Sequence, residues 1–251
     1  MTKELESTTL EQPPSNSLGY MAPPLDGNSE VYNKSISIPD HEIVAIDKKY
    51  IANKHMKFSL VDSSDFREIN ILEGDGFIEY SCKKEGTLLS IYDMNHNVVI
   101  STRVQSDFKK LEIIKNTENS SSDDISITYA TIETKSKITD NERNYKITIL
   151  NKTTNEMEEL NMDYEKLYND KYYSIYCNNG TDNKAMIGAI KKNKPLGRND
   201  ETVTVEVAPM VDYMLLLGLG VLVKRIESRK KNLKDEKTDI LITTALMCII
   251  S

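Results

Sequence analysis

The chain has 251 residues, of which 39% are hydrophobic and 28% are charged, and its formal net charge at pH 7 is −7. This length and apolar content suffice for one large domain or two small ones, so a wholly disordered chain is excluded. The negative charge argues against a general nucleic-acid binder, which needs a basic face to contact phosphates. Three cysteines without CxxC spacing (Cys82, Cys177 and Cys248) and a polar N-terminus without a secretory signal predict a cytoplasmic protein.

The first segment, residues 1–34, contains the proline pairs Pro13-Pro14 and Pro23-Pro24 among Ser, Glu, Asn and Gly. It shows no apolar period, so the composition predicts a disordered tail. The proline pairs leave two alternatives, a contact for a protein partner with an aromatic groove or a plain linker.

From Ser35 onward, short runs rich in β-formers are separated by turn residues every 8–12 positions. Met56, Phe58 and Leu60 show the alternation, and Asn179-Gly180 is a typical hairpin turn. This spacing predicts an antiparallel sandwich or barrel of about eleven or twelve strands. The runs that suggest these strands lie within residues 36–38, 43–46, 50–61, 77–82, 87–92, 98–104, 108–115, 125–129, 145–149, 157–167 (compatible with a strand plus a short helical turn), 172–177, 184–190 and 202–207.

After Pro209 the period changes, and Tyr213 to Val223 contains no charged or strongly polar residue. At 100° per residue its apolar side chains point in every direction, so a helix here must be enclosed by protein or by lipid. Eleven residues rise only about 16 Å, roughly half the hydrocarbon thickness of a bilayer. The pattern therefore predicts a strand leading into a helix, at about residues 210–226, that is enclosed by its own domain.

This stretch also carries a family resemblance. Val205-Glu-Val-Ala-Pro209 and Asp212, followed by an aliphatic helix, resemble the C-terminal signature of the LURP-one-related proteins. These belong to the tubby C-terminal-like group, which includes the phospholipid scramblases. Met210 departs from the pattern, because glycine is usual there. The resemblance covers roughly residues 43–227 and is strongest over the last thirty.

The resemblance implies a mainly β fold, a closed antiparallel barrel of about twelve strands around a buried hydrophobic C-terminal helix. A barrel of this size has room for one helix on its axis. Gly218 and Gly220 then suggest a close approach of the helix to the barrel wall, and Asp212 stands where a carboxylate would cap the helix.

No pattern of catalytic or metal-binding residues stands out. His41, His55 and His96 lie far apart in the sequence, and Gly74 and Gly76 lack the strand-to-helix context of a phosphate loop. We therefore expect no enzyme activity, no cofactor and no metal. The resemblance to scramblases is incomplete, because residues 199–201 keep two carboxylates but form no graded calcium loop, and no cysteine cluster is present.

The strongest candidate for a binding surface is the basic run that follows the apolar helix. Residues 224–237 hold seven basic and three acidic residues, a net charge of +4 in an acidic chain. Such a run attracts an anionic membrane surface, and it also suits the negative end of a helix dipole. The candidate lipid-binding residues are Lys224, Arg225, Arg229, Lys230 and Lys231.

Two functions remain open, a non-enzymatic binding or scaffold protein of the cytoplasm, and a peripheral membrane protein that binds anionic phospholipid or, at the limit, scrambles it. The expected domains are a tail at 1–34, the barrel with its helix at 35–228, and a basic then apolar tail at 229–251. For the apolar residues 238–251, an extra element on the barrel and an interfacial anchor are alternatives.

Overall fold

The fold was obtained as a computed structural model, which describes residues 35–63, 68–74, 76–105, 107–115, 127–137, 143–167, 170–178, 184–193 and 202–250. At residues 167, 170, 193 and 234–250 it describes the backbone alone. Residues 35–251 form one compact unit. The tail predicted at residues 1–34 lies outside the described residues.

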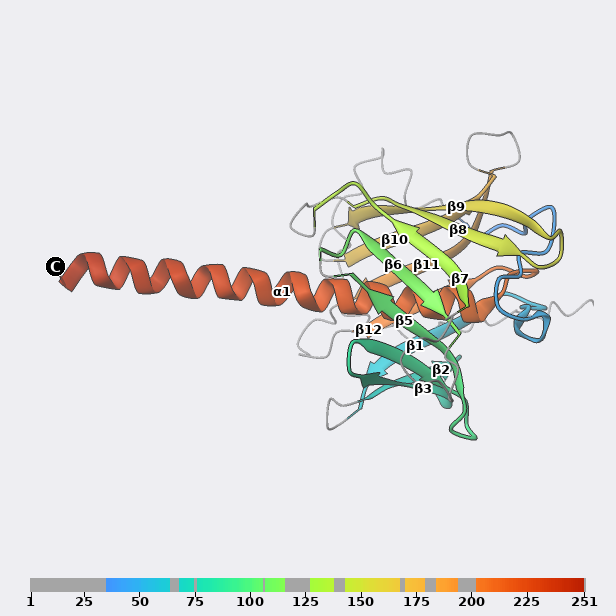
Figure 1. Ribbon diagram of the computed structural model, residues 1–251, viewed down its shortest axis with the longest axis horizontal. Helices are drawn as coiled ribbons and strands as arrows, with labels where there is room; N and C mark the ends of the chain where they lie inside the picture. Colours follow the sequence, from blue (N-terminus) through green and yellow to red (C-terminus); the bar gives the residue numbers. More distant parts are fainter. Residues whose placement is uncertain are drawn as a thin grey trace, which may run out of the picture. The chain divides into compact units, whose positions relative to one another are not determined.

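The central feature is a closed barrel in which every strand is antiparallel to its neighbours (Figure 1). The strands follow one another around the barrel in sequence order, and the last pairs with the first through the register Phe58↔Val205. This confirms the predicted fold class and leaves no free sheet edge for unwanted pairing. The strands are β1 Met56–Asp62, β2 Glu68–Glu73, β3 Phe77–Glu85, β4 Leu88–Tyr92, β5 Val98–Val104, β6 Lys110–Ile114, β7 Thr128–Glu133, β8 Tyr145–Asn151, β9 Glu156–Leu167, β10 Asp170–Cys177, β11 Ala185–Asn193 and β12 Thr202–Val207.

The strand predictions were wrong at three places. Strand β2 was not expected, because its sequence, Glu-Ile-Asn-Ile-Leu-Glu, is short and lies between charged residues. Residues 36–38 and 43–46 were expected as strands but form none; Ile43 makes only an isolated bridge to Val211. Residues 157–167 form one continuous strand with no helical turn. Pairing with neighbouring strands overrode the local pattern in β2 and β9, whereas residues 36–38 and 43–46 form no strand.

Inside the barrel, side chains alternate as the strand period requires. On β8, Tyr145, Ile147, Ile149 and Asn151 are buried, and Lys146 and Leu150 between them are exposed. The same alternation buries Phe58 and Leu60 on β1.

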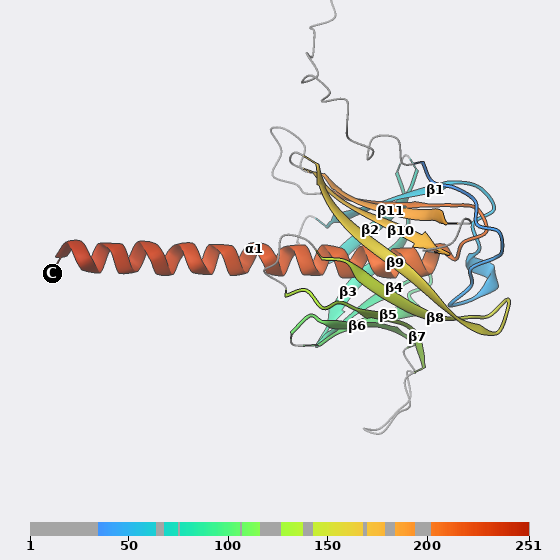
Figure 2. The same cartoon turned by 90° about the horizontal axis from the view of Figure 1, so that it is seen from above.

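The helix α1, Tyr213–Ile250, begins inside the barrel and runs along its axis (Figure 2). Leu215, Leu216, Leu217, Leu219 and Val223 are all fully buried. Each such side chain contributes about 1.5–3 kcal/mol when it leaves water, an upper value because unfolded chains are already partly compact. The prediction of an enclosed apolar helix is confirmed.

The helix does not end near residue 226, as the sequence predicted, but continues to Ile250 beyond the barrel (Figure 1). No glycine follows Gly220 and no proline follows Pro209, so nothing in the sequence terminates it. The segment 224–237 is also rich in Lys, Glu and Arg, which favour helices. The basic and apolar tail predicted at 229–251 is therefore, in its backbone, the second half of one helix.

Two helix glycines lie against the barrel wall, as predicted. A Cβ added to Gly218 would lie 2.8 Å from Ile113 Cδ1, and one added to Gly220 would lie 2.6 Å from Val205 Cγ2. Real side chains do not approach so closely. Glycine at these two positions lets the helix and the strands pack together.

We expect Gly220→Ala to destabilise the protein by about 1–2 kcal/mol, although alanine favours helices. The new methyl group would meet Val205, a β-branched and fully buried side chain with little freedom to move. Urea unfolding would measure the change. Ser228→Ala, at an exposed position of the same helix, is the matched control and should change stability by less than about 0.5 kcal/mol. A gain in stability for Gly220→Ala would contradict the close packing.

Candidate functional site

The two ends of the barrel differ, and we call them the capped end and the exit end. The capped end is the end where α1 begins, and it is covered by residues 40–52, which we call the covering segment (Figure 1). The exit end is the end where residues 224–231 of α1 leave the barrel. The predicted lipid-binding residues all belong to the exit end.

At the capped end, the carboxylate of Asp212 joins the covering segment to the helix. One oxygen accepts hydrogen bonds from the amides of Met214 (3.1 Å) and Leu215 (3.2 Å), and the other from Ile46 (2.7 Å) and Asp47 (3.4 Å). Burial raises the pKa of Asp212 to about 6, and the four amide hydrogen bonds oppose that rise. The predicted helix cap is confirmed, and its second role, holding residues 46–47, appears only in the structure.

The backbone just before Asp212 explains the glycine usual in the family pattern. Met210 has a φ of 68°, in the left-handed region that favours glycine. Its amide donates to the carbonyl of Ala52 (2.8 Å), and its carbonyl accepts from the amide of Ile43 (3.0 Å). These two hydrogen bonds hold the strained residue between two parts of the covering segment.

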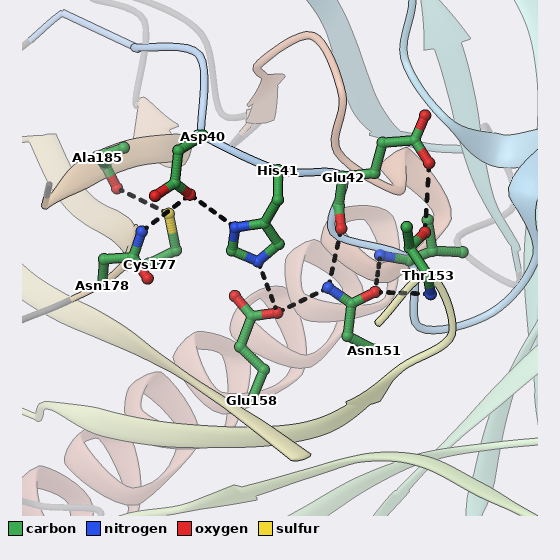
Figure 3. A network of polar contacts seen from close by, with 10 residues as sticks. Asp40, His41, Glu42, Asn151, Thr153, Glu158, Cys177, Asn178 and Ala185 are labelled. Carbon is green, nitrogen blue, oxygen red and sulfur yellow. Dashed lines mark hydrogen bonds and ion pairs between the residues drawn. The ribbon is translucent and has the colours of Figure 1, made fainter. Parts of the chain in front are cut away.

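A polar network around His41 ties the same covering segment to the strands (Figure 3). The His41 ring lies 2.6 Å from Asp40 through Nδ1 and 3.2 Å from Glu158 through Nε2. Asn151 donates to Glu158 (2.8 Å) and to the carbonyl of Glu42 (2.8 Å). Burial lowers the pKa of His41, but the hydrogen bonds to the two carboxylates outweigh it, and the net shift is upward.

Cys177 lies beside this network, and a cysteine near a histidine can act as a nucleophile when its thiol ionises (Figure 3). The thiol is fully buried and donates to the carbonyl of Ala185 (3.8 Å). Burial raises its pKa to about 11, and that of Cys82 to about 12, so both remain thiols at neutral pH. The network therefore supports a structural connection between segments and not nucleophilic chemistry.

No local pattern in the sequence indicates this network. His41 and Glu158 are 117 positions apart, and no local spacing links them. The closing of the barrel brings β9 to the covering segment, so this contact depends on the tertiary fold.

At the exit end, the predicted lipid-binding residues Lys224, Arg225 and Lys230 contact the barrel. The Lys224 ammonium lies 3.0 Å from the Asp62 carboxylate, and Arg225 donates to the carbonyl of Thr87 (3.0 Å). Burial lowers the pKa of Arg225. These two side chains hold the helix to the rim of the barrel.

Lys230 points toward the interior of the exit end. Its ammonium lies 3.6 Å from the Glu227 carboxylate and 5.4 Å from the ring centre of Tyr164. Glu227 is fully buried, accepts a hydrogen bond from the Tyr173 hydroxyl (2.8 Å), and pairs with Lys171. Burial raises the pKa of Glu227, but Lys171 and Lys230 outweigh this effect and the net shift is downward.

The other two predicted residues, Arg229 and Lys231, are exposed on α1 where it leaves the barrel. The basic run therefore has two parts with different surroundings. Lys224, Arg225 and Lys230 face the barrel, while Arg229 and Lys231 face solvent. The sequence could not separate them, because the strand ends decide which face of the helix is covered.

Neither a metal centre nor a membrane span appears in the part of the chain that the structure describes. Among the described side chains, no group of three or more His, Cys, Asp or Glu residues is arranged to hold a metal ion. Within the same residues, no helix combines the length and the apolar character needed to cross a bilayer.

Comparison with known proteins agrees with the resemblance seen in the sequence. The family model described as LURP-one-related matches residues 42–224, which include the barrel and most of the enclosed part of the helix. Neither a curated protein nor a solved structure gives a significant match.

Proposed function

We propose, because this chain belongs to the LURP-one-related family, that it is a non-enzymatic binding or scaffold module of the cytoplasm. The observation that carries this proposal is the packing of the barrel interior. Strand residues such as Leu60 and Val205 and helix residues such as Leu216 belong to one core cluster there, and all three are fully buried. An interior packed in this way favours recognition at the ends and the outer surface. The proline pairs in residues 1–34 are a second candidate contact for a protein partner.

Titration with a fluorescent fatty acid and with an apolar dye tests recognition outside the interior. We expect no saturable uptake by the folded chain, because the helix occupies the volume that a lipid-binding barrel keeps for its ligand. Saturable binding of one probe per chain would contradict the proposal.

A second function, peripheral binding to anionic phospholipid, is supported by the two exposed cations at the exit end. Arg229 and Lys231 are exposed residues of the helix α1, which extends beyond the barrel (Figure 2). A basic residue close to an anionic leaflet contributes about 1 kcal/mol. Lipid scrambling would be the limiting case of this activity.

We expect the protein to sediment with vesicles that contain phosphatidylserine at low salt, and to be released at high salt. The double charge reversal Arg229→Glu, Lys231→Glu should weaken binding by about 2–4 kcal/mol, or at least about thirtyfold. Co-sedimentation at several lipid concentrations measures the change.

The matched control for this experiment is Lys54→Glu, Lys57→Glu, two exposed lysines near the capped end. It changes the net charge equally but at the other end of the barrel, so it should retain most of the binding. Equal losses in the two variants would show that net charge and not the exit end attracts the vesicles. No sedimentation of the unmodified chain would remove the membrane function and leave the first proposal standing.

A further inference from the structure

Arg143 is a fully buried arginine whose charge is incompletely satisfied. Its Nη2 donates to the carbonyl of Phe108 (2.6 Å), but Nε and Nη1 have no hydrogen-bond acceptor among the described residues. The guanidinium carbon lies 5.2 Å from the ring centre of Tyr145, whose buried hydroxyl likewise has no partner within the described part of the chain. A buried guanidinium keeps its charge, and unpaired buried donors are costly, so these groups need an acceptor.

The neighbouring charges are mostly positive. Arg143 and Lys171 both act electrostatically on Lys230, and the pKa of Lys230 is lowered, first by burial and then by these two cations. The carboxylate among them, Glu227, is already engaged by Lys171, Lys230 and the Tyr173 hydroxyl. Among the residues that the structure describes, three cations and one carboxylate give this cluster a net charge of +2 at the exit end.

The alternation of the strands places these groups together. Tyr145 is the first residue of β8, and Lys171 and Tyr173 lie near the start of β10. Strand β9 between them contributes the buried Tyr164, while the next residue, Glu165, belongs to the opposite face of the strand. Glu227 and Lys230 approach from α1. The cluster therefore lies between the helix and three adjacent strands.

We propose that Arg143, Tyr145 and Lys230 form a binding site for a small oxyanion of the phosphate class, inside the exit end of the barrel. Such an anion offers several oxygens to the two unpaired guanidinium nitrogens, the phenol hydroxyl and the ammonium group. A phosphate or phosphomonoester with nearly two negative charges matches the net charge of the cluster. The site is separate from the exposed Arg229 and Lys231, so it does not depend on membrane binding.

The test is thermal unfolding of the full-length chain in increasing inorganic phosphate, with chloride used to keep the ionic strength constant. Isothermal titration calorimetry gives the stoichiometry. We expect saturable stabilisation by one phosphate per chain. Arg143→Met should weaken phosphate binding at least tenfold, because it removes both unpaired donors and keeps the buried volume. Lys231→Met makes the same charge change at an exposed site on α1 and should bind phosphate as the parent does.

Two milder variants decide the question if Arg143→Met does not fold. Tyr145→Phe removes one hydroxyl, Lys230→Met removes one cation, and each should weaken phosphate binding at least threefold. Phosphate that stabilises the parent no more than chloride does would overturn the proposal. Equal affinity of the parent and the folded variants would overturn it as well.

An experiment with vesicles distinguishes binding of a free anion from binding of a lipid headgroup. Vesicles of phosphatidylcholine with phosphatidic acid present a phosphomonoester on a surface. The site binds a lipid headgroup if free phosphate displaces the protein from these vesicles and if Arg143→Met or Tyr145→Phe weakens vesicle binding. The site binds a soluble oxyanion if these vesicles do not change the affinity of the protein for free phosphate. The variant Arg229→Glu, Lys231→Glu should keep its phosphate affinity, so failure of either proposal is distinguishable from failure of the other.

Discussion

Leu217→Asp should unfold the entire barrel and not merely release the end of the helix. Leu217 is fully buried in the enclosed part of α1. The substitution removes an apolar side chain worth about 2–5 kcal/mol and places an unpaired carboxylate in the core, at a further cost of several kcal/mol. Domains of this kind are stable by only about 5–15 kcal/mol in total, so the folded state should be lost.

Circular dichroism and thermal melting would measure this effect. The matched control is Arg229→Asp, which places the same new side chain at an exposed position of the same helix. We expect the control to melt cooperatively within a few degrees of the parent. A cooperative melt of Leu217→Asp at the parent temperature would contradict the enclosed helix.

Asp212→Ala should destabilise the protein by about 4 kcal/mol or more at neutral pH. Four amides donate to the Asp212 carboxylate, and each donor left buried without an acceptor costs about 1–3 kcal/mol, although part of this cost is relieved by local rearrangement. The loss should also detach the covering segment, because Ile46 and Asp47 are held by the same carboxylate as the helix. Urea unfolding gives the free energy, and hydrogen exchange at Ile46 and Asp47 reports the detachment.

The variant Asp212→Asn keeps the shape of the side chain but removes its negative charge. Its side chain keeps one acceptor oxygen but turns an NH₂ group toward two of the four amide donors. We expect it to lose much of the stability that Asp212→Ala loses. A variant as stable as the parent would show that the amide hydrogen bonds contribute little.

The effect of Asp212→Ala should depend on pH in a defined direction. The pKa of Asp212 rises from an ordinary value of 3.8 to about 6 in the folded protein. The folded state binds the proton of Asp212 more tightly than the unfolded state does. The stability that this protonation contributes is fully present below pH 3.8 and is lost as the pH rises through 6. The total change is about 3 kcal/mol, of which about 2 kcal/mol falls between pH 4.5 and 7.5.

Measured stability should therefore show a larger loss for Asp212→Ala at pH 4.5 than at pH 7.5. Comparing variant and parent at each pH removes the titration of other groups, including His41. A loss that grows toward pH 7.5 would mean that the four amides lower the pKa of Asp212 more than burial raises it.

The positions of the basic residues bear on both proposals for the exit end. Lys224, Arg225 and Lys230 contact the rim or the interior of the barrel, and Arg229 and Lys231 are the exposed residues on which the membrane proposal rests. The oxyanion site around Arg143 lies among the engaged residues. The basic run thus contributes Lys230 to the proposed oxyanion site and Arg229 and Lys231 to the exposed surface, and substitutions at these positions test the two proposals separately.

The local sequence pattern alone determined much of the secondary structure and the core of this protein. Alternation of Val203, Val205 and Val207 fixed a strand, and the uncharged stretch from Tyr213 to Val223 required an enclosed helix, because a helix that is apolar all round cannot face water. The residues around Asp212 carried the family resemblance. These signals are strong because periodicity and burial act on residues that are close in sequence.

Only the tertiary structure decided the remaining features. His41 pairs with Glu158 across 117 positions, the buried Arg143 donates to the carbonyl of Phe108 across 35 positions, and Lys224 of the basic run pairs with Asp62 across 162 positions. Their positions follow from the closure of β1 on β12 around the helix, a long-range event that no short window of sequence reports. The sequence therefore determined which segments must be strand, helix and core. The closed barrel decided which polar side chains meet at its two ends, because strand register and helix rotation set those contacts together.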